Sequence, residues 1–115
     1  MKGDDPNLAR IVIVTHPNEA DARTMAATLV EEGMAACVTV MPGATSIYKD
    51  GDKLVEAAEA QMLIKTREGC IGPLKHRAIH LHPFDNPELV VLPTDGGSSK
   101  YIKWIAEQTA HCPSH

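Results

Sequence analysis

The spacing of apolar residues changes along the chain, and each change marks a new element. Ala9–Thr15 is a short apolar run rich in β-branched residues, which predicts a buried strand. The next apolar residues recur at helical spacing, with Asn18 placed to cap the helix and Gly33 to end it. The apolar stripe of this helix is made by Ala22, Met25, Ala26, Leu29 and Val30. The chain therefore opens with a strand and an amphipathic helix.

A long hairpin is predicted next. Cys37–Tyr48 is typical of a second strand, in which Pro42-Gly43 should produce a bend or bulge. Asp50-Gly51 is a turn signal, and Lys53–Thr66 predicts a third strand. The first half of that strand is polar and its last half is apolar. We therefore expect the tip of the hairpin to lie in water and its base to lie in the core.

The last part of the chain predicts a helix, a strand and a helix. Pro73 fits the first turn of the second helix, and Leu89–Leu92 is typical of a fourth strand closed by Pro93. The apolar face of the second helix is made by Leu74, Ala78 and Leu81. A last helix follows residues 96–99, where a serine can cap it. One face of that helix is made by Tyr101, Trp104, Ile105 and Gln108.

This order of elements predicts an α+β fold, the ferredoxin-like βαββαβ sandwich with a long hairpin between its second and third strands and an extra C-terminal helix. The crossovers place two helices on one face of the sheet and leave the other face bare. The bare face and the hairpin favour self-association. We expect one domain over residues 1–115, with residues 1–8 and 110–115 as loose tails.

Composition excludes several classes of protein. The net charge is -4 and the basic residues are scattered, which argues against nucleic-acid binding. No apolar run reaches the length of a membrane span, and the N-terminus lacks the apolar centre of a signal peptide. The three cysteines have no metal-ligand spacing, so we expect a reduced, cytoplasmic chain. Because only 3% of the residues are aromatic, Tyr101 and Trp104 are candidate anchors at a subunit interface.

His82 and Glu88 are the first candidates for chemistry. They lie six residues apart in a proline-rich turn, where they can bind a metal ion together or hold each other in a hydrogen bond. Cys37 is either a third ligand or a small buried apolar residue. His76 and His80 are four residues apart on a helix, but they lie opposite its apolar face and should be solvated.

Lys65 ends an apolar strand, where it can bind an anion or pair with Glu59 or Glu88. No nucleophile, base and acid can be assembled from neighbouring motifs, and there is no phosphate-binding glycine loop. The sequence therefore favours a binding protein over an enzyme.

Several short motifs occur in a fixed order between residues 35 and 104. They are Ala35-Ala36-Cys37-Val38, Pro42-Gly43-Ala44-Thr45-Ser46-Ile47-Tyr48, Glu59-Ala60-Gln61-Met62-Leu63-Ile64-Lys65-Thr66, His82-Pro83-Phe84, Pro87-Glu88 and Tyr101-Ile102-Lys103-Trp104. Over roughly residues 11–104 the chain resembles the CutA family of divalent-cation tolerance proteins. Two departures stand out: Asp50-Gly51-Asp52 replaces the Trp-Glu-Gly of many members, and Phe84 replaces the usual Tyr.

The resemblance implies a ferredoxin-like homotrimer with hairpins reaching between subunits, and a role in tolerance to copper and other divalent ions. The first hypothesis is therefore a metal-responsive protein that binds Cu(II) or a similar ion through His82 and Glu88, with Cys37 as a further candidate. The second is a PII-like signalling or adaptor module. It would bind a small anion or a partner protein in the inter-subunit cleft through Lys65, Tyr48 and Glu88. An acylphosphatase-type enzyme is disfavoured, because residues 15–18 contain no arginine.

Overall fold

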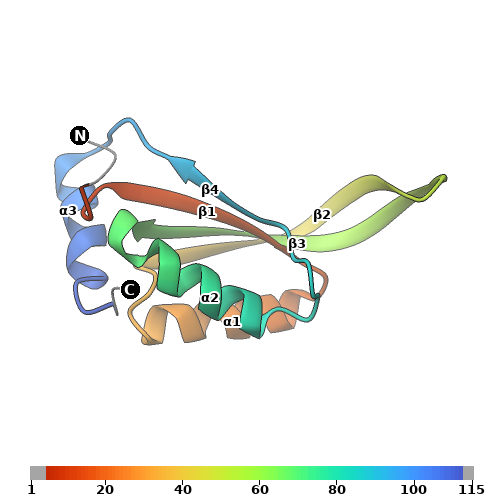
Figure 1. The fold of residues 1–115 in the computed structure, drawn as a ribbon, viewed down its shortest axis with the longest axis horizontal. Helices are drawn as coiled ribbons and strands as arrows, with labels where there is room; N and C mark the ends of the chain where they lie inside the picture. Colours follow the sequence, from red (N-terminus) through yellow and green to blue (C-terminus); the bar gives the residue numbers. More distant parts are fainter. Residues whose placement is uncertain (1–4, 113–115) are drawn as a thin grey trace.

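A four-stranded antiparallel sheet forms the centre of the computed structural model, which describes residues 5–112 (Figure 1). The strands lie in the order β2-β3-β1-β4. The elements are β1 (Ala9–His16), α1 (Glu19–Glu31), β2 (Cys37–Asp50), β3 (Lys53–Arg67), the short 3-10 helix η2 (Glu68–Cys70), α2 (Ile71–Leu81), β4 (Leu89–Pro93) and α3 (Ser99–Gln108). The predicted α+β, ferredoxin-like fold is confirmed.

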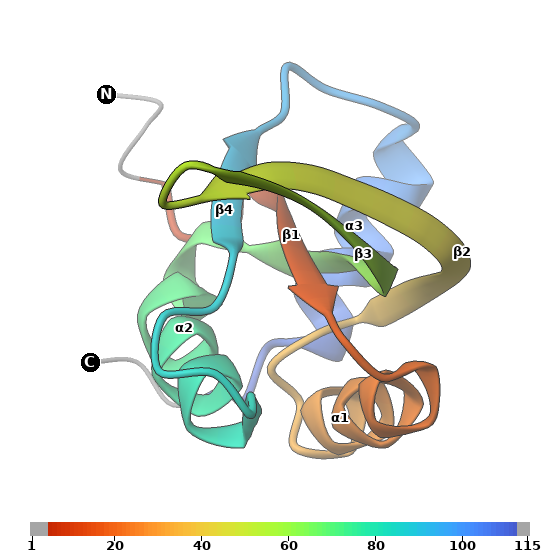
Figure 2. The ribbon, with the colours of Figure 1, turned by 90° about the vertical axis from the view of Figure 1, so that its right-hand side faces the viewer.

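Helices α1 and α2 cover one face of the sheet (Figure 2). Asn18 caps α1 through its side-chain oxygen, which accepts a 2.9 Å hydrogen bond from the backbone N–H of Asp21. The main core lies between these helices and the sheet. Its largest buried members are Val12, Val14, Met25, Leu29, Met62, Ile64 and Leu74. The prediction is wrong for one residue of the apolar stripe of α1. Val30 is 41% exposed, because it follows Leu29 around the helix and lies beyond the buried face.

The opposite face of the sheet is exposed in a single chain. Met41, Val90 and Leu92 all expose more than a third of their surface there. Helix α3 lies at the end of the sheet far from the hairpin, where Ile105 packs against Ala9 and Ala36 (Figure 1). Apart from the end that α3 covers, the structure therefore leaves the apolar residues of this sheet face exposed, as the sequence predicted.

The distal part of the β2–β3 hairpin, residues 44–59, forms an arm that projects beyond the rest of the molecule (Figure 1). β1 pairs with β3 only from Ala60 to Arg67, so the two strands of the arm pair with each other alone. The predicted irregularity at Pro42-Gly43 is a bulge, since Met41 pairs with Gln61 while Ala44 pairs with Glu59. Gly43 has φ +78°, which a side chain would strain.

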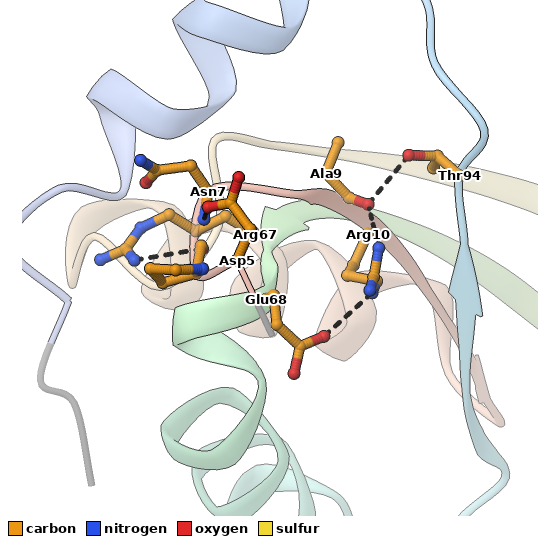
Figure 3. A network of polar contacts seen from close by, with 8 residues as sticks. Asp5, Asn7, Ala9, Arg10, Arg67, Glu68 and Thr94 are labelled. Atoms are coloured by element: carbon orange, nitrogen blue, oxygen red, sulfur yellow. Dashed lines mark hydrogen bonds and ion pairs between the residues drawn. The ribbon is translucent and has the colours of Figure 1, made fainter. Parts of the chain in front are cut away.

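The first and last of the described residues contact the end of β3 and the turn after α3. Among residues 5–8, the carbonyl of Pro6 accepts hydrogen bonds from the backbone of Gly69 at 2.9 Å and from the Arg67 side chain at 3.4 Å. Figure 3 shows this region, with Asp5 and Asn7 beside Arg67. Glu68 donates to the carbonyl of Leu8 at 2.8 Å. At the other end, Cys112 is buried. The backbone N–H groups of Glu68 and Gly69 and the side chain of Arg67 therefore tie residues 5–8 to the β3–η2 junction. The loose tails expected at residues 1–8 and 110–115 stay a prediction. Residues 1–4 and 113–115 lie outside the described residues.

Candidate functional site

Thr15, near the end of β1, is the point at which the predicted site residues meet. Its carbonyl oxygen accepts a 2.8 Å hydrogen bond from Nε2 of His82. Its hydroxyl donates to Oε2 of Glu88, and its backbone N–H donates to the carbonyl of Glu88 at 3.4 Å. The sheet explains this convergence: β1 is central, and the α2–β4 connection passes its end. Thr15 therefore fixes Glu88 from both main chain and side chain.

The imidazole of His82 is held by two backbone groups. Because the Thr15 carbonyl can only accept, Nε2 carries the proton. Nδ1 accepts from the N–H of Phe84 at 3.1 Å. The side chain is buried, with 7% of the residue surface exposed. In this arrangement neither nitrogen offers a lone pair to a metal ion, since one is protonated and the other is already an acceptor. The geometry assigns His82 to positioning the loop, and its predicted role as a ligand finds no support in it.

A second buried histidine lies beside it, and sequence reasoning missed it. The rings of His16 and His82 have centroids 4.9 Å apart. Nδ1 of His16 accepts a 3.0 Å hydrogen bond from the N–H of Asn18, the residue that caps α1. Burial lowers the pKa of His16, and the neighbouring His82 lowers it further. The signal in the sequence was a histidine directly after a buried strand and two residues before a helix cap.

An open cleft of about 580 Å³ lies in front of Thr15, between the arm and the loop before β4. Its lining residues are Thr15, Ser46, Ile47, Tyr48, Glu59, Phe84, Asn86 and Glu88. Two of these are carboxylates, from β3 and from the residue before β4, and none of the eight is basic. Carboxylate, phenol and amide oxygens together suit a cation rather than an anion. The cleft therefore brings the predicted residues Tyr48 and Glu88 together and adds Glu59.

Lys65 and Cys37 lie elsewhere. They face each other across β2 and β3, with Lys65 Nζ 3.9 Å from Cys37 Sγ, and Lys65 also bonds to the hydroxyl of Thr39. Lys65 pairs with Ile11, whereas Thr15 pairs with Gln61, so Lys65 is about 13 Å further along the strand. The predicted pairing of Lys65 with Glu59 or Glu88 is therefore wrong: the strand carries its ammonium group to Thr39.

The three predicted metal ligands, His82, Glu88 and Cys37, are thus not assembled in one chain. Across residues 5–112, no group of three or more His, Cys, Asp or Glu side chains is placed to hold a metal ion. On α2, His76 and His80 are exposed, as predicted. On α3, the rings of Tyr101 and Trp104 stack with centroids 5.6 Å apart, and both residues are exposed. Their interface role stays a prediction.

Helices long and apolar enough to cross a bilayer are absent from residues 5–112.

Comparison with known proteins gives one family. The model of the family "CutA1 divalent ion tolerance protein" matches residues 10–108. The divalent-cation tolerance protein CutA of Thermus thermophilus is 43% identical over 102 residues, covering 89% of this chain and 99% of that protein. The chloroplastic protein CutA of Arabidopsis thaliana is 37% identical, covering 86% of this chain and 54% of that protein.

Solved structures agree with this assignment. The structure of the Thermus thermophilus protein superposes with a TM-score of 0.85 and covers 89% of this chain and 99% of that one. CutA1 from Oryza sativa is 35% identical with a TM-score of 0.86, covering 89% of this chain and 94% of that one.

Proposed function

Because the chain belongs to the CutA1 divalent ion tolerance family, we propose that it acts in divalent-cation tolerance by binding such an ion in the cleft in front of Thr15. The observation that carries the proposal is the carboxylate of Glu88, held on the cleft wall by the Thr15 hydroxyl and accompanied in the lining by Glu59. Fixed carboxylates of this kind take divalent ions without the cost of ordering a loose side chain.

Among such ions, Cu(II) is expected to bind most tightly, since it heads the affinity order of the divalent first-row metals. The roles of the predicted residues then change. Glu88 is a ligand, Tyr48 and Asn86 line the approach, and His82 positions the loop through Thr15. Thr15 positions Glu88 without contacting the ion itself. Substitution of a residue with this role typically lowers metal affinity by about 10–100-fold.

We further propose that the protein is a homotrimer. The uncovered sheet face and the arm support self-association. On the arm, which projects away from the core of its own chain, Leu54 is 72% exposed and Ile47 is 61% exposed. The CutA resemblance supplies the number of subunits. Light scattering that gives a single-chain mass at micromolar concentration would contradict this part.

The alternative, a PII-like module for a small anion, has less support. It requires Lys65, Tyr48 and Glu88 in one place, and Lys65 lies further along β3 against Thr39. Two carboxylates in the cleft also repel an anion. We propose a binding role without catalysis, because the nearest base, His82, is occupied by backbone groups.

The test is a competitive Cu(II) titration of the purified protein against a chromophoric chelator. We expect saturable binding in the wild type and at least about tenfold weaker binding for Glu88→Gln and for Thr15→Val. Glu56→Gln removes an exposed carboxylate from the arm and serves as the matched control. The proposal fails if Glu88→Gln binds as the wild type does while the double variant His76→Ala/His80→Ala loses binding.

A further inference from the structure

The carbonyl oxygen of Thr109, just after α3, is a shared acceptor for three segments of the chain. It accepts from Arg67 Nε at 3.1 Å and Nη2 at 3.0 Å. The thiol of Cys70 donates to it at 3.5 Å, and the backbone N–H of Cys112 donates at 3.2 Å. Thr109 and Cys70 are fully buried. The end of β3, η2 and the turn after α3 therefore meet at one atom.

This meeting point brings two thiol side chains together. Cys70 comes from η2 and Cys112 from the C-terminal turn, and their side chains hydrogen-bond to each other. Burial raises the pKa of Cys112 to about 12, and the hydrogen bond to Cys70 adds to the shift. Cys37 belongs to another part of the sheet, where it faces Lys65.

We propose that Cys70 and Cys112 form an intramolecular disulfide that clamps the C-terminal turn onto η2. Cys112 lies beyond the residues that match the family model, 10–108, so the pair is a property of this chain rather than of the matched region. The segment that the bond would close, residues 70–112, contains α2, β4, α3 and the loop that carries Phe84 and Glu88. Oxidation would therefore close a covalent loop of the chain that includes one wall of the cleft.

The chemistry is thiol–disulfide exchange with a small disulfide such as oxidised glutathione. One cysteine, as its thiolate, attacks a sulfur of the oxidant and forms a mixed disulfide, releasing one glutathione thiolate, which takes up a proton. The neighbouring cysteine, deprotonated in turn, attacks the protein sulfur of the mixed disulfide and releases the second glutathione. The two cysteines lose two protons and two electrons in total, and one oxidised glutathione takes them up to become two reduced molecules.

The raised pKa of Cys112 governs the rate. Only thiolates react, so the bond should form slowly at neutral pH and faster as the pH rises. Access requires the turn to open beyond Thr109, which is itself held by Arg67 and Cys70. This opening breaks the bonds of Ala110 N–H to Glu107 at 3.3 Å and of Cys112 N–H to Thr109 at 3.2 Å. Local openings of this kind require less free energy than global unfolding.

The experiment treats the full chain with oxidised glutathione at pH 8.5, then counts free thiols after denaturation and maps cross-links in an unreduced digest. The wild type should fall from three thiols to one, with Cys70 linked to Cys112. Cys37→Ser should fall from two thiols to none. Cys70→Ser and Cys112→Ser are the matched controls and should show no internal cross-link. Three remaining thiols, glutathione adducts alone, or a cross-link through Cys37 would overturn the proposal.

A second measurement tests the clamp itself. Closing a loop of about 40 residues should raise the melting temperature of oxidised Cys37→Ser by on the order of 10 °C over its reduced form. Dithiothreitol should reverse the rise, and Cys70→Ser treated in the same way should show none. A confirmed cross-link with an unchanged melting temperature would refute the clamp.

Discussion

The substitution His82→Ala separates a positioning residue from a metal ligand. In the structure the imidazole donates to Thr15 at 2.8 Å and accepts from Phe84 at 3.1 Å, and it is buried. Alanine would leave the Thr15 carbonyl and the Phe84 N–H without these partners. An unsatisfied buried group costs about 1–3 kcal/mol, so we expect a loss of about 2–4 kcal/mol in unfolding free energy.

Guanidinium denaturation at a fixed protomer concentration measures this loss, since subunit association would make stability depend on concentration. His80→Ala is the matched control: it removes an exposed imidazole two residues away and should change the unfolding free energy by less than about 0.5 kcal/mol. His82→Gln should recover part of the loss, because its amide can donate to the Thr15 carbonyl.

Two results would refute the positioning role. One is a loss below about 0.5 kcal/mol for His82→Ala, which would mean that the two backbone bonds contribute nothing net. The other is a variant that keeps its stability but loses Cu(II) binding, which would return His82 to the ligand role that the sequence suggested.

Further predictions concern His16, Arg67 and Leu74. Because burial lowers the folded pKa of His16 below 6.5, the unfolded chain binds a proton first, so stability should fall as the pH drops below about 6.5; the effect should vanish in His16→Gln, as measured by denaturation between pH 5 and 8. Arg67→Met removes the side-chain donors to Thr109 and Pro6 and should lower the unfolding free energy by about 2–3 kcal/mol in the same assay. Leu74→Ala empties a fully buried site and should lower it by about 2–5 kcal/mol, while exposed Lys75→Ala should leave it unchanged.

The fold could be predicted because its elements are set by local patterns. The β-branched run of β1, the cap at Asn18 and the Pro42-Gly43 bulge all act within a few residues, and the structure confirms each. The bare sheet face also followed, since two crossovers place both helices on the same side. The prediction for Val30 was wrong because the apolar pattern of a helix does not show where the surface that packs against the helix ends.

The sequence predicted some of the residues that form the site, but not how they are arranged. The sequence singled out His82 and Glu88 and left open whether they share an ion or a hydrogen bond. Instead both contact Thr15, which is 67 and 73 positions away, and only the strand order places it there. The sequence paired Lys65 with Glu59 or Glu88 because of their opposite charges. The register of β3 with β2 instead places Lys65 opposite Cys37. Long-range pairing decides such contacts, and spacing along the chain does not report it.

The bulge at Pro42-Gly43 determines which β2 residues lie on each face of the arm. Before it, odd-numbered β2 residues pair with odd-numbered β3 residues, as Thr39 does with Leu63; after it, Ser46 pairs with Ala57. Side chains alternate between faces, so inserting or deleting one residue of β2 here would exchange the faces of the β2 side chains in the arm, while those of β3 keep theirs. Ile47 would then take the face that Tyr48 now holds, and every β2 residue out to the tip would exchange faces. A change of two residues in the length of β2 keeps each of these side chains on its present face of the hairpin, and a change of one residue moves it to the other face.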